Sequence, residues 1–144
     1  MAGLIKKFAI ALGCSSLALL FVGMGNVSTS RGEQAGTLHV ESSKRSFGEA
    51  PVGAKPVVVF RLGNRTGHPI KILGSNAGCY RAACLVPMGL PLLVPVGESR
   101  DLEIEVDCYN PGDLSKTVTF FTDNRDQRKI ALSVEGRVVE SPTR

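Results

Sequence analysis

The sequence predicts an all-β fold, namely an immunoglobulin-like antiparallel β-sandwich of about seven strands, preceded by an N-terminal export signal or membrane anchor. Two observations support this fold class. From Thr37 onward, short segments rich in Val, Ile, Leu, Phe and Thr are separated by clusters of Gly, Pro, Asn and Asp, a spacing typical of strands and turns. No stretch of this region keeps a helical period beyond about two turns.

The predicted strands follow one another along nearly the whole remaining chain. They are Thr37–Ser42, Lys55–Asn64, Ile70–Ser75, Pro91–Pro95, Arg100–Asp107, Lys116–Thr122 and Lys129–Val139. Alternation of apolar and polar residues assigns their faces, because successive side chains of a strand point to opposite sides of the sheet. In Lys55–Asn64, alternation places Val57, Val59 and Arg61 on one face and Val58, Phe60 and Leu62 on the other, and Phe47 and Phe60 are expected in the core. The inward positions predicted in the later strands are Leu102, Ile104, Val106, Val118, Phe120, Ile130, Leu132 and Val134.

The N-terminal segment has the order of charged, apolar and polar regions of a secretory signal. Lys6 and Lys7 precede an apolar run from Phe8 to Gly25, and the chain then turns polar. We expect export, with cleavage of this segment; retention as an inner-membrane anchor is the alternative. The domain organisation predicted is a signal or anchor over 1–30, a polar linker over 31–36 and the sandwich over 37–140. Cys14 lies within the apolar run and is assigned to the leader.

Charge and composition argue against a nucleic-acid partner. The formal net charge is +4, and without Lys6 and Lys7 it is +2. The remaining Lys and Arg are scattered among Asp and Glu, whereas a nucleic-acid interface needs basic residues clustered on one face. We expect no membrane contact beyond the N-terminal segment, if that segment is retained.

Several motifs appear in an order that resembles a known family. They are "FGEAPVG" with Phe47, Gly48 and Gly53, then "FRLGNRTGHPIKI", a Cys loop, "VPVGESRDLEIEVD", "KTVTFFTDN" and "IALSVEGRV". This order resembles the bacterial exported family called domain of unknown function 1573, which is related to the major sperm protein and Hydin-type domains. The resemblance covers Ser46 to Val139 and implies an Ig-like fold, an extracytoplasmic compartment and protein–protein contact. The family usually has Cys-Gly-Cys after the third strand, whereas this chain has Cys79 and Cys84.

The cysteines of the domain are the main candidate site. Cys79 follows the third predicted strand and Cys108 ends the fifth, so Cys79, Cys84 and Cys108 should lie at one pole of the sandwich. Exported proteins favour disulfides, and one thiol is left over if a bridge forms. A bridge from Cys79 or Cys84 to Cys108 would pin the loop to the sandwich. A Cys79–Cys84 bridge would close only the loop itself.

The alternative to a disulfide is a thiolate metal site or a thiol-redox protein that uses the same three cysteines. Two observations disfavour it: Cys-x4-Cys is loose for metal ligands, and His68 belongs to a turn at the opposite pole. His39 is isolated, and no Cys-x-x-Cys opens a helix. We therefore predict no cofactor and no metal.

Sequence motifs for catalysis are also missing, since the chain contains no G-x-S-x-G, P-loop or H-E-x-x-H pattern. The prediction is a non-catalytic domain, not an enzyme, that binds an unknown protein partner or has a structural role in the periplasm or cell envelope. Two surfaces are candidates. One is the Cys pole with Tyr80, Arg81, Tyr109 and Asn110, because Tyr and Arg often anchor interfaces. The other is an exposed edge strand that pairs with a partner strand.

Overall fold

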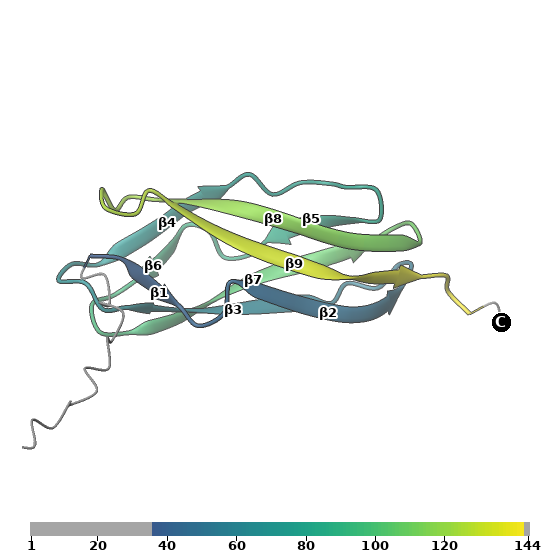
Figure 1. The fold of residues 1–144 in the computed structure, drawn as a ribbon, viewed down its shortest axis with the longest axis horizontal. Helices are drawn as coiled ribbons and strands as arrows, with labels where there is room; N and C mark the ends of the chain where they lie inside the picture. Colours follow the sequence, from purple (N-terminus) through teal and green to yellow (C-terminus); the bar gives the residue numbers. More distant parts are fainter. Residues whose placement is uncertain (1–35, 143–144) are drawn as a thin grey trace, which may run out of the picture. The chain divides into compact units, whose positions relative to one another are not determined.

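A computed structural model describes residues 36–142, and these residues fold as an all-β sandwich of two sheets (Figure 1). The strands are β1 Leu38–Val40, β2 Lys44–Pro51, β3 Val57–Asn64, β4 Ile70–Ser75, β5 Ala83–Pro87, β6 Leu92–Val94, β7 Ser99–Cys108, β8 Gly112–Thr122 and β9 Lys129–Val139. The fold class predicted from the sequence is confirmed. The predicted signal or anchor and the linker up to residue 35 lie outside the described residues. Within 36–142, no helix is long and apolar enough to cross a membrane.

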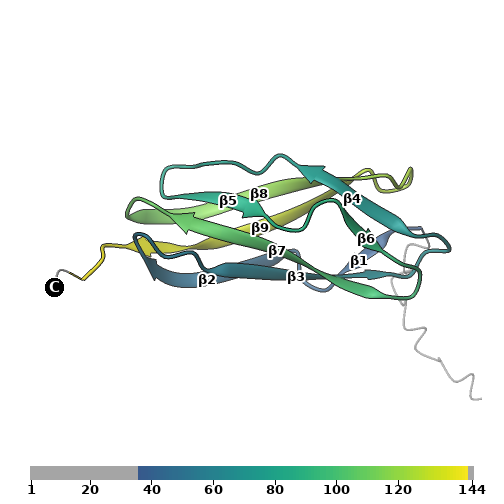
Figure 2. The ribbon, with the colours of Figure 1, turned by 180° about the vertical axis from the view of Figure 1, so that it is seen from behind.

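One sheet has the strand order β1-β3-β7-β5 and the other β2-β9-β8-β4-β6; we call them sheet A and sheet B. All neighbouring strands are antiparallel except β2 and β9, which run parallel. The β2–β9 pair, whose strand β2 was not predicted, is thus the parallel exception in an antiparallel sandwich. Figure 2 shows the same two sheets from behind.

The core lies between the sheets and follows from the alternation of apolar residues. In β3, Val58, Phe60 and Leu62 are buried while Val57 and Val59 are exposed. All the inward positions predicted from alternation are buried. Their removal from water is the main favourable contribution to folding, because burial of each large apolar side chain contributes about 1.5–3 kcal/mol.

Two strands were missed by the sequence analysis. In β2, the residues are mostly polar, and a register shift against β9 between Ser46 and Glu49 interrupts the period of two. Gly48, within this irregular stretch, has a φ of 73°, which a residue with a Cβ adopts only at a cost. β5 lies within the predicted Cys loop; Ala83 and Leu85 are buried and Val86 is exposed, as alternation requires in a strand.

Side chains of the polar turn "TDN" at the end of β8 hydrogen-bond to the backbone of the turn and of β4. Asn124 Oδ1 accepts from the backbone N–H of Asp126 at 3.1 Å, and Asp123 Oδ1 accepts from the N–H of Lys71 at 2.8 Å. The hydroxyl of Thr122 donates to the carbonyl of Gln127. These side chains satisfy backbone groups of the turn and of the neighbouring strand β4, so their role here is structural.

Candidate functional site

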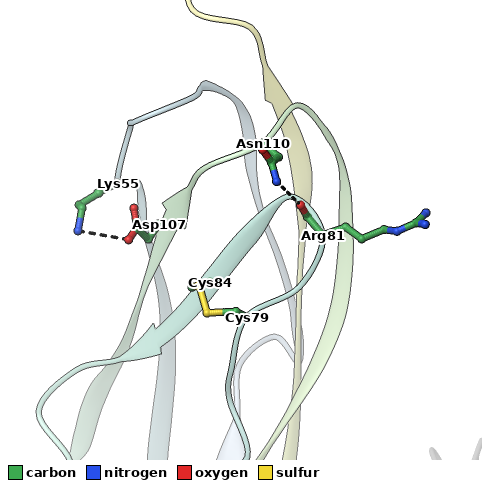
Figure 3. The surroundings of a disulfide bond; sticks show 6 residues. All are labelled: Lys55, Cys79, Arg81, Cys84, Asp107 and Asn110. Carbon is green, nitrogen blue, oxygen red and sulfur yellow. Dashed lines mark hydrogen bonds and ion pairs between the residues drawn. A yellow bond between two sulfur atoms is a disulfide. The ribbon is translucent and has the colours of Figure 1, made fainter.

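Cys79 and Cys84, at the Cys pole, form a cross-link within a single loop. Cys79 and Cys84 form a disulfide, and the two residues also pair as an isolated antiparallel bridge (Figure 3). Backbone hydrogen bonds from Tyr80 N to Ala83 O and from Leu85 N to Gly78 O complete this small hairpin, at 2.9 and 3.0 Å. The bond therefore holds the loop before β5 against β5 itself. Of the pairings left open by the sequence, those with Cys108 do not occur.

Cys108 is the remaining thiol of the described chain and lies on the other face of sheet A. It pairs with Ala83, next to Cys84, but its side chain is only 1% exposed and belongs to the core. Burial raises the pKa of the Cys108 thiol, and the nearby Asp107 carboxylate raises this pKa further. Because Cys84 faces outward and Cys108 inward, the three sulfurs cannot converge on one ion. No group of three His, Cys, Asp or Glu residues within 36–142 is arranged to hold a metal.

The disulfide should stabilise the domain modestly. Because the loop that it closes is short, the chain-entropy model gives about 2 kcal/mol, less than a bridge to Cys108 would supply. We expect Cys79→Ser/Cys84→Ser to lower the free energy of unfolding by about this amount, measured by denaturant titration. Wild type in reductant should match the double variant, and peptide mapping without reductant should yield a Cys79–Cys84 cross-link. Equal stability of wild type with and without reductant would contradict the prediction.

The loop between the cysteines is fixed to the end of β7. The carbonyl of Ala82 accepts from the N–H groups of Tyr109 and Asn110 at 3.1 and 3.2 Å, and Asn110 Nδ2 donates to the Arg81 carbonyl at 3.3 Å. Tyr80 is half-buried and packs on the core, whereas Arg81 and Asn110 are exposed. The four predicted surface residues therefore do lie together. Figure 3 shows the Arg81 side chain pointing away from the disulfide.

A groove lies between this loop and β8. It has a volume of about 350 Å³ and is lined by Tyr80, Arg81, Ala82, Asp113, Leu114 and Lys116. Lys116 Nζ lies 4.7 Å from the centroid of the Tyr80 ring, within the range of a cation–π contact. Arg137 Nε donates to Asp113 Oδ1 at 2.7 Å, and this hydrogen bond lowers the pKa of Asp113. The loop side of the groove was predicted, but Asp113, Leu114 and Lys116 were not.

The wall of the groove formed by β8 is an open strand edge. β8 pairs with β9 along Gly112–Phe121, whereas β4 pairs with it only as far as Phe120. Asn76 then adds two hydrogen bonds to Thr119, at 3.0 and 2.7 Å, before the chain leaves for sheet A. Figures 1 and 2 both show the β4–β5 connection running alongside β8.

Alternation determines which groups this edge presents. Even-numbered residues of β8 bond to β9, as Thr122 N does to Arg128 O, so the N–H and C=O groups of odd-numbered residues point the other way. Within residues 36–142, no hydrogen bond reaches these groups of Asp113, Ser115 and Thr117. An exposed edge was predicted without a location, because the length of β4 depends on where the chain departs from β8, at Asn76.

The two sheets form an immunoglobulin-like β-sandwich. The chain is similar to the "ASH / PapD-like domain of human CEP192 (PapD-like domain 7)", with a TM-score of 0.61 and 12% identity over 74% of this chain and 88% of that one. It is also similar to a protein of unknown function from Porphyromonas gingivalis W83, with a TM-score of 0.55 and 15% identity over 72% of this chain and 47% of that one.

Two protease chains match this fold over a smaller part of their own length. The Vibrio cholerae serine protease VesC matches with a TM-score of 0.55 and 12% identity, over 75% of this chain but 24% of its own. The VesB protease of the same organism matches over 31% of its chain, with a TM-score of 0.51 and 14% identity. At these identities the likeness concerns the fold alone. No family model and no curated protein matches the sequence.

Proposed function

We propose that this chain is a non-catalytic protein-binding module of the bacterial cell envelope that holds an extended segment of its partner along the open edge of β8. The observation that carries the proposal is the row of unpaired backbone groups at Asp113, Ser115 and Thr117 beside a preformed groove. An added strand would take the place that β4 leaves vacant beyond Asn76. Main-chain hydrogen bonds would supply affinity, and the groove would select side chains.

The groove has side chains suited to such contacts. Tyr80 offers a half-buried aromatic surface whose position is fixed by the hairpin, so little side-chain entropy is lost on binding. Arg81 and Lys116 are exposed and stand on opposite walls. The disulfide contributes indirectly, because it holds the loop at the distance from β8 that keeps the groove open.

The placement in an oxidising, extracytoplasmic compartment rests on two supports. The Cys79–Cys84 bond is of a kind that persists outside the cytosol, and the N-terminal residues have the composition of an export signal. The proposal also includes membership of the exported family named above and a location in the periplasm or cell envelope.

A competing structural explanation is that β8 is simply a protected edge. Charged side chains on edge strands oppose unwanted pairing, and Asp113 and Lys116 are charged and exposed. The two explanations differ in what they predict for added peptides. A protected edge takes up none, whereas a binding edge takes up extended peptides through their backbone amides.

The test uses short soluble peptides that alternate Val or Ile with Thr, added to the full-length protein. Hydrogen exchange should show slowed exchange at the amides of Ser115 and Thr117. Two peptides that are N-methylated on alternate sets of amides form a matched pair. N-methylation of the amides that face β8 should abolish binding, whereas N-methylation of the amides on the other edge should not, because only one edge of an added strand faces β8. Thr117→Pro removes one of the free donors without breaking the ladder to β9, and it should weaken binding about tenfold. Equal binding of both N-methylated sets would refute strand addition.

A further inference from the structure

The outer face of sheet A carries a column of carboxylates between two apolar borders. The outward residues of β7 include Asp101, Glu103, Glu105 and Asp107. On either side stand Val57 and Val59 of β3 and Val86 and Met88 of β5 or just after it, all between 40% and 48% exposed. These large apolar side chains are only partly covered within residues 36–142.

The strand register aligns these residues in two rows that run across the sheet. Glu105 pairs with Val57 on one side and Val86 on the other. Glu103 pairs with Val59, and its carbonyl accepts from the N–H of Met88 at 2.9 Å. Each row thus places a carboxylate between two exposed aliphatic side chains.

The cations near this face leave it acidic. Lys55 Nζ lies 3.3 Å from Glu105 Oε1 and 3.6 Å from Asp107 Oδ2. Arg61 Nη1 lies 3.2 Å from Asp101 Oδ1. Within the described chain, no ion pair involves Glu103. The four carboxylates and two cations leave a local charge of about −2, which a surface with cations among apolar side chains would complement.

The outer face of sheet B offers such a surface. Leu73, Leu93 and Phe121 are exposed there, at 52%, 48% and 38%. Lys71 pairs with Leu93, and Phe121 pairs with Lys129. Lys129 Nζ lies 6.0 Å from the Phe121 ring centroid, and the Asp123 carboxylate nearby accepts from the backbone N–H of Lys71. This face therefore combines apolar side chains with two exposed ammonium groups.

Within residues 36–142, seven of the nine large exposed hydrophobic residues lie on these two faces; the other two are Val96 and Tyr109. Exposed apolar side chains gathered on one face are typical of interaction sites, and here the two faces carry opposite local charge. We propose that a second copy of this chain is the occupant: the acidic outer face of sheet A in one copy binds the basic outer face of sheet B in the next. This contact uses surfaces other than the groove and does not depend on the function proposed above.

Such a contact is heterologous, because it joins two different faces. The two faces lie on opposite sides of one sandwich, so each copy keeps one of them free after pairing. The charges are exposed and screened by salt, so association should be weak and salt-dependent. A symmetric contact of sheet A with sheet A would instead bring like charges together.

The test is sedimentation velocity of the full-length protein at increasing concentration, at low and at high salt. The wild type should associate at low salt and dissociate at high salt. Glu103→Lys or Lys129→Glu alone should weaken association about tenfold. Glu140→Lys changes the net charge as Glu103→Lys does, but its residue follows β9 and belongs to neither face, so this variant should behave like wild type.

The decisive sample is an equimolar mixture of Glu103→Lys and Lys129→Glu. The first variant retains the native face of sheet B and the second the native face of sheet A, so the mixture should form a one-to-one complex of near wild-type affinity. A symmetric contact of sheet A with sheet A predicts instead that Glu103→Lys alone associates at least as strongly as wild type, because this substitution reduces the repulsion between like charges. The proposal is overturned if wild type stays monomeric up to about 1 mM, if the mixture does not recover, or if Glu140→Lys weakens association equally.

Discussion

Replacing Asn64 by Ala is expected to lower the free energy of unfolding by about 3–4 kcal/mol, because several buried polar groups would lose their partners together. Asn64 is 1% exposed at the end of β3. Its Nδ2 donates to the carbonyls of His68 and Val94 at 2.9 and 2.8 Å. Its Oδ1 accepts from the N–H and the hydroxyl of Thr66 at 2.9 and 2.7 Å. One side chain thus joins the β3–β4 turn to β6.

Asn76→Ala provides the matched control for this prediction. The same atoms are removed, but Asn76 is exposed and its Oδ1 accepts a single hydrogen bond, from Thr119 N. Water can replace that partner, so a loss of about 1 kcal/mol is expected. Urea titrations of both variants with unchanged m-values would measure the difference. An Asn64→Ala protein no less stable than Asn76→Ala would show that the buried network contributes little.

The second large effect is expected at Gly136 in β9, over which the ring of Phe47 lies. A Cβ at Gly136 would come within 2.5 Å of Phe47 Cε1. The ring is half-buried against the core, so moving it disrupts packing. We expect Gly136→Ala to cost about 2–3 kcal/mol, as overpacking does in well-packed sites. The aromatic ring in turn covers backbone that glycine leaves bare.

Two further variants isolate this contact. Gly74→Ala in β4 is the control, since a Cβ there meets no heavy atom within 4 Å, and it should change stability little. In the double variant Phe47→Ala/Gly136→Ala the clash is absent, so the combined loss should be smaller than the sum of the single losses. Strictly additive losses in thermal or denaturant unfolding would rule out the proposed steric origin.

The Phe47–Gly136 contact also explains why two of the sequence motifs occur together. "FGEAPVG" and "IALSVEGRV" are distant in the chain, yet they supply the ring and the glycine of one contact across the β2–β9 pair. Phe47 was predicted to be a core residue and is in fact half-buried at the edge of the core. Its main partner could not be predicted, because strand pairing and register decide which glycine lies beneath it.

What the sequence determined by itself was the class of fold and the interior of most strands. Alternation is a local property, so β3, β7, β8 and β9 could be located and their faces assigned from residues a few positions apart. The grouping of Cys79, Cys84 and Cys108 at one pole also followed, because the order of antiparallel strands fixes which ends meet.

Only the tertiary structure decided which partners these elements take. The parallel placement of β2, the choice of the Cys79–Cys84 bond and the inward direction of Cys108 depend on register between distant strands. The open edge of β8 exists because β4 leaves sheet B at Asn76. Hydrogen bonds across a sheet join residues far apart in sequence, and shifting a strand by one residue exchanges its faces, so local patterns cannot specify these contacts.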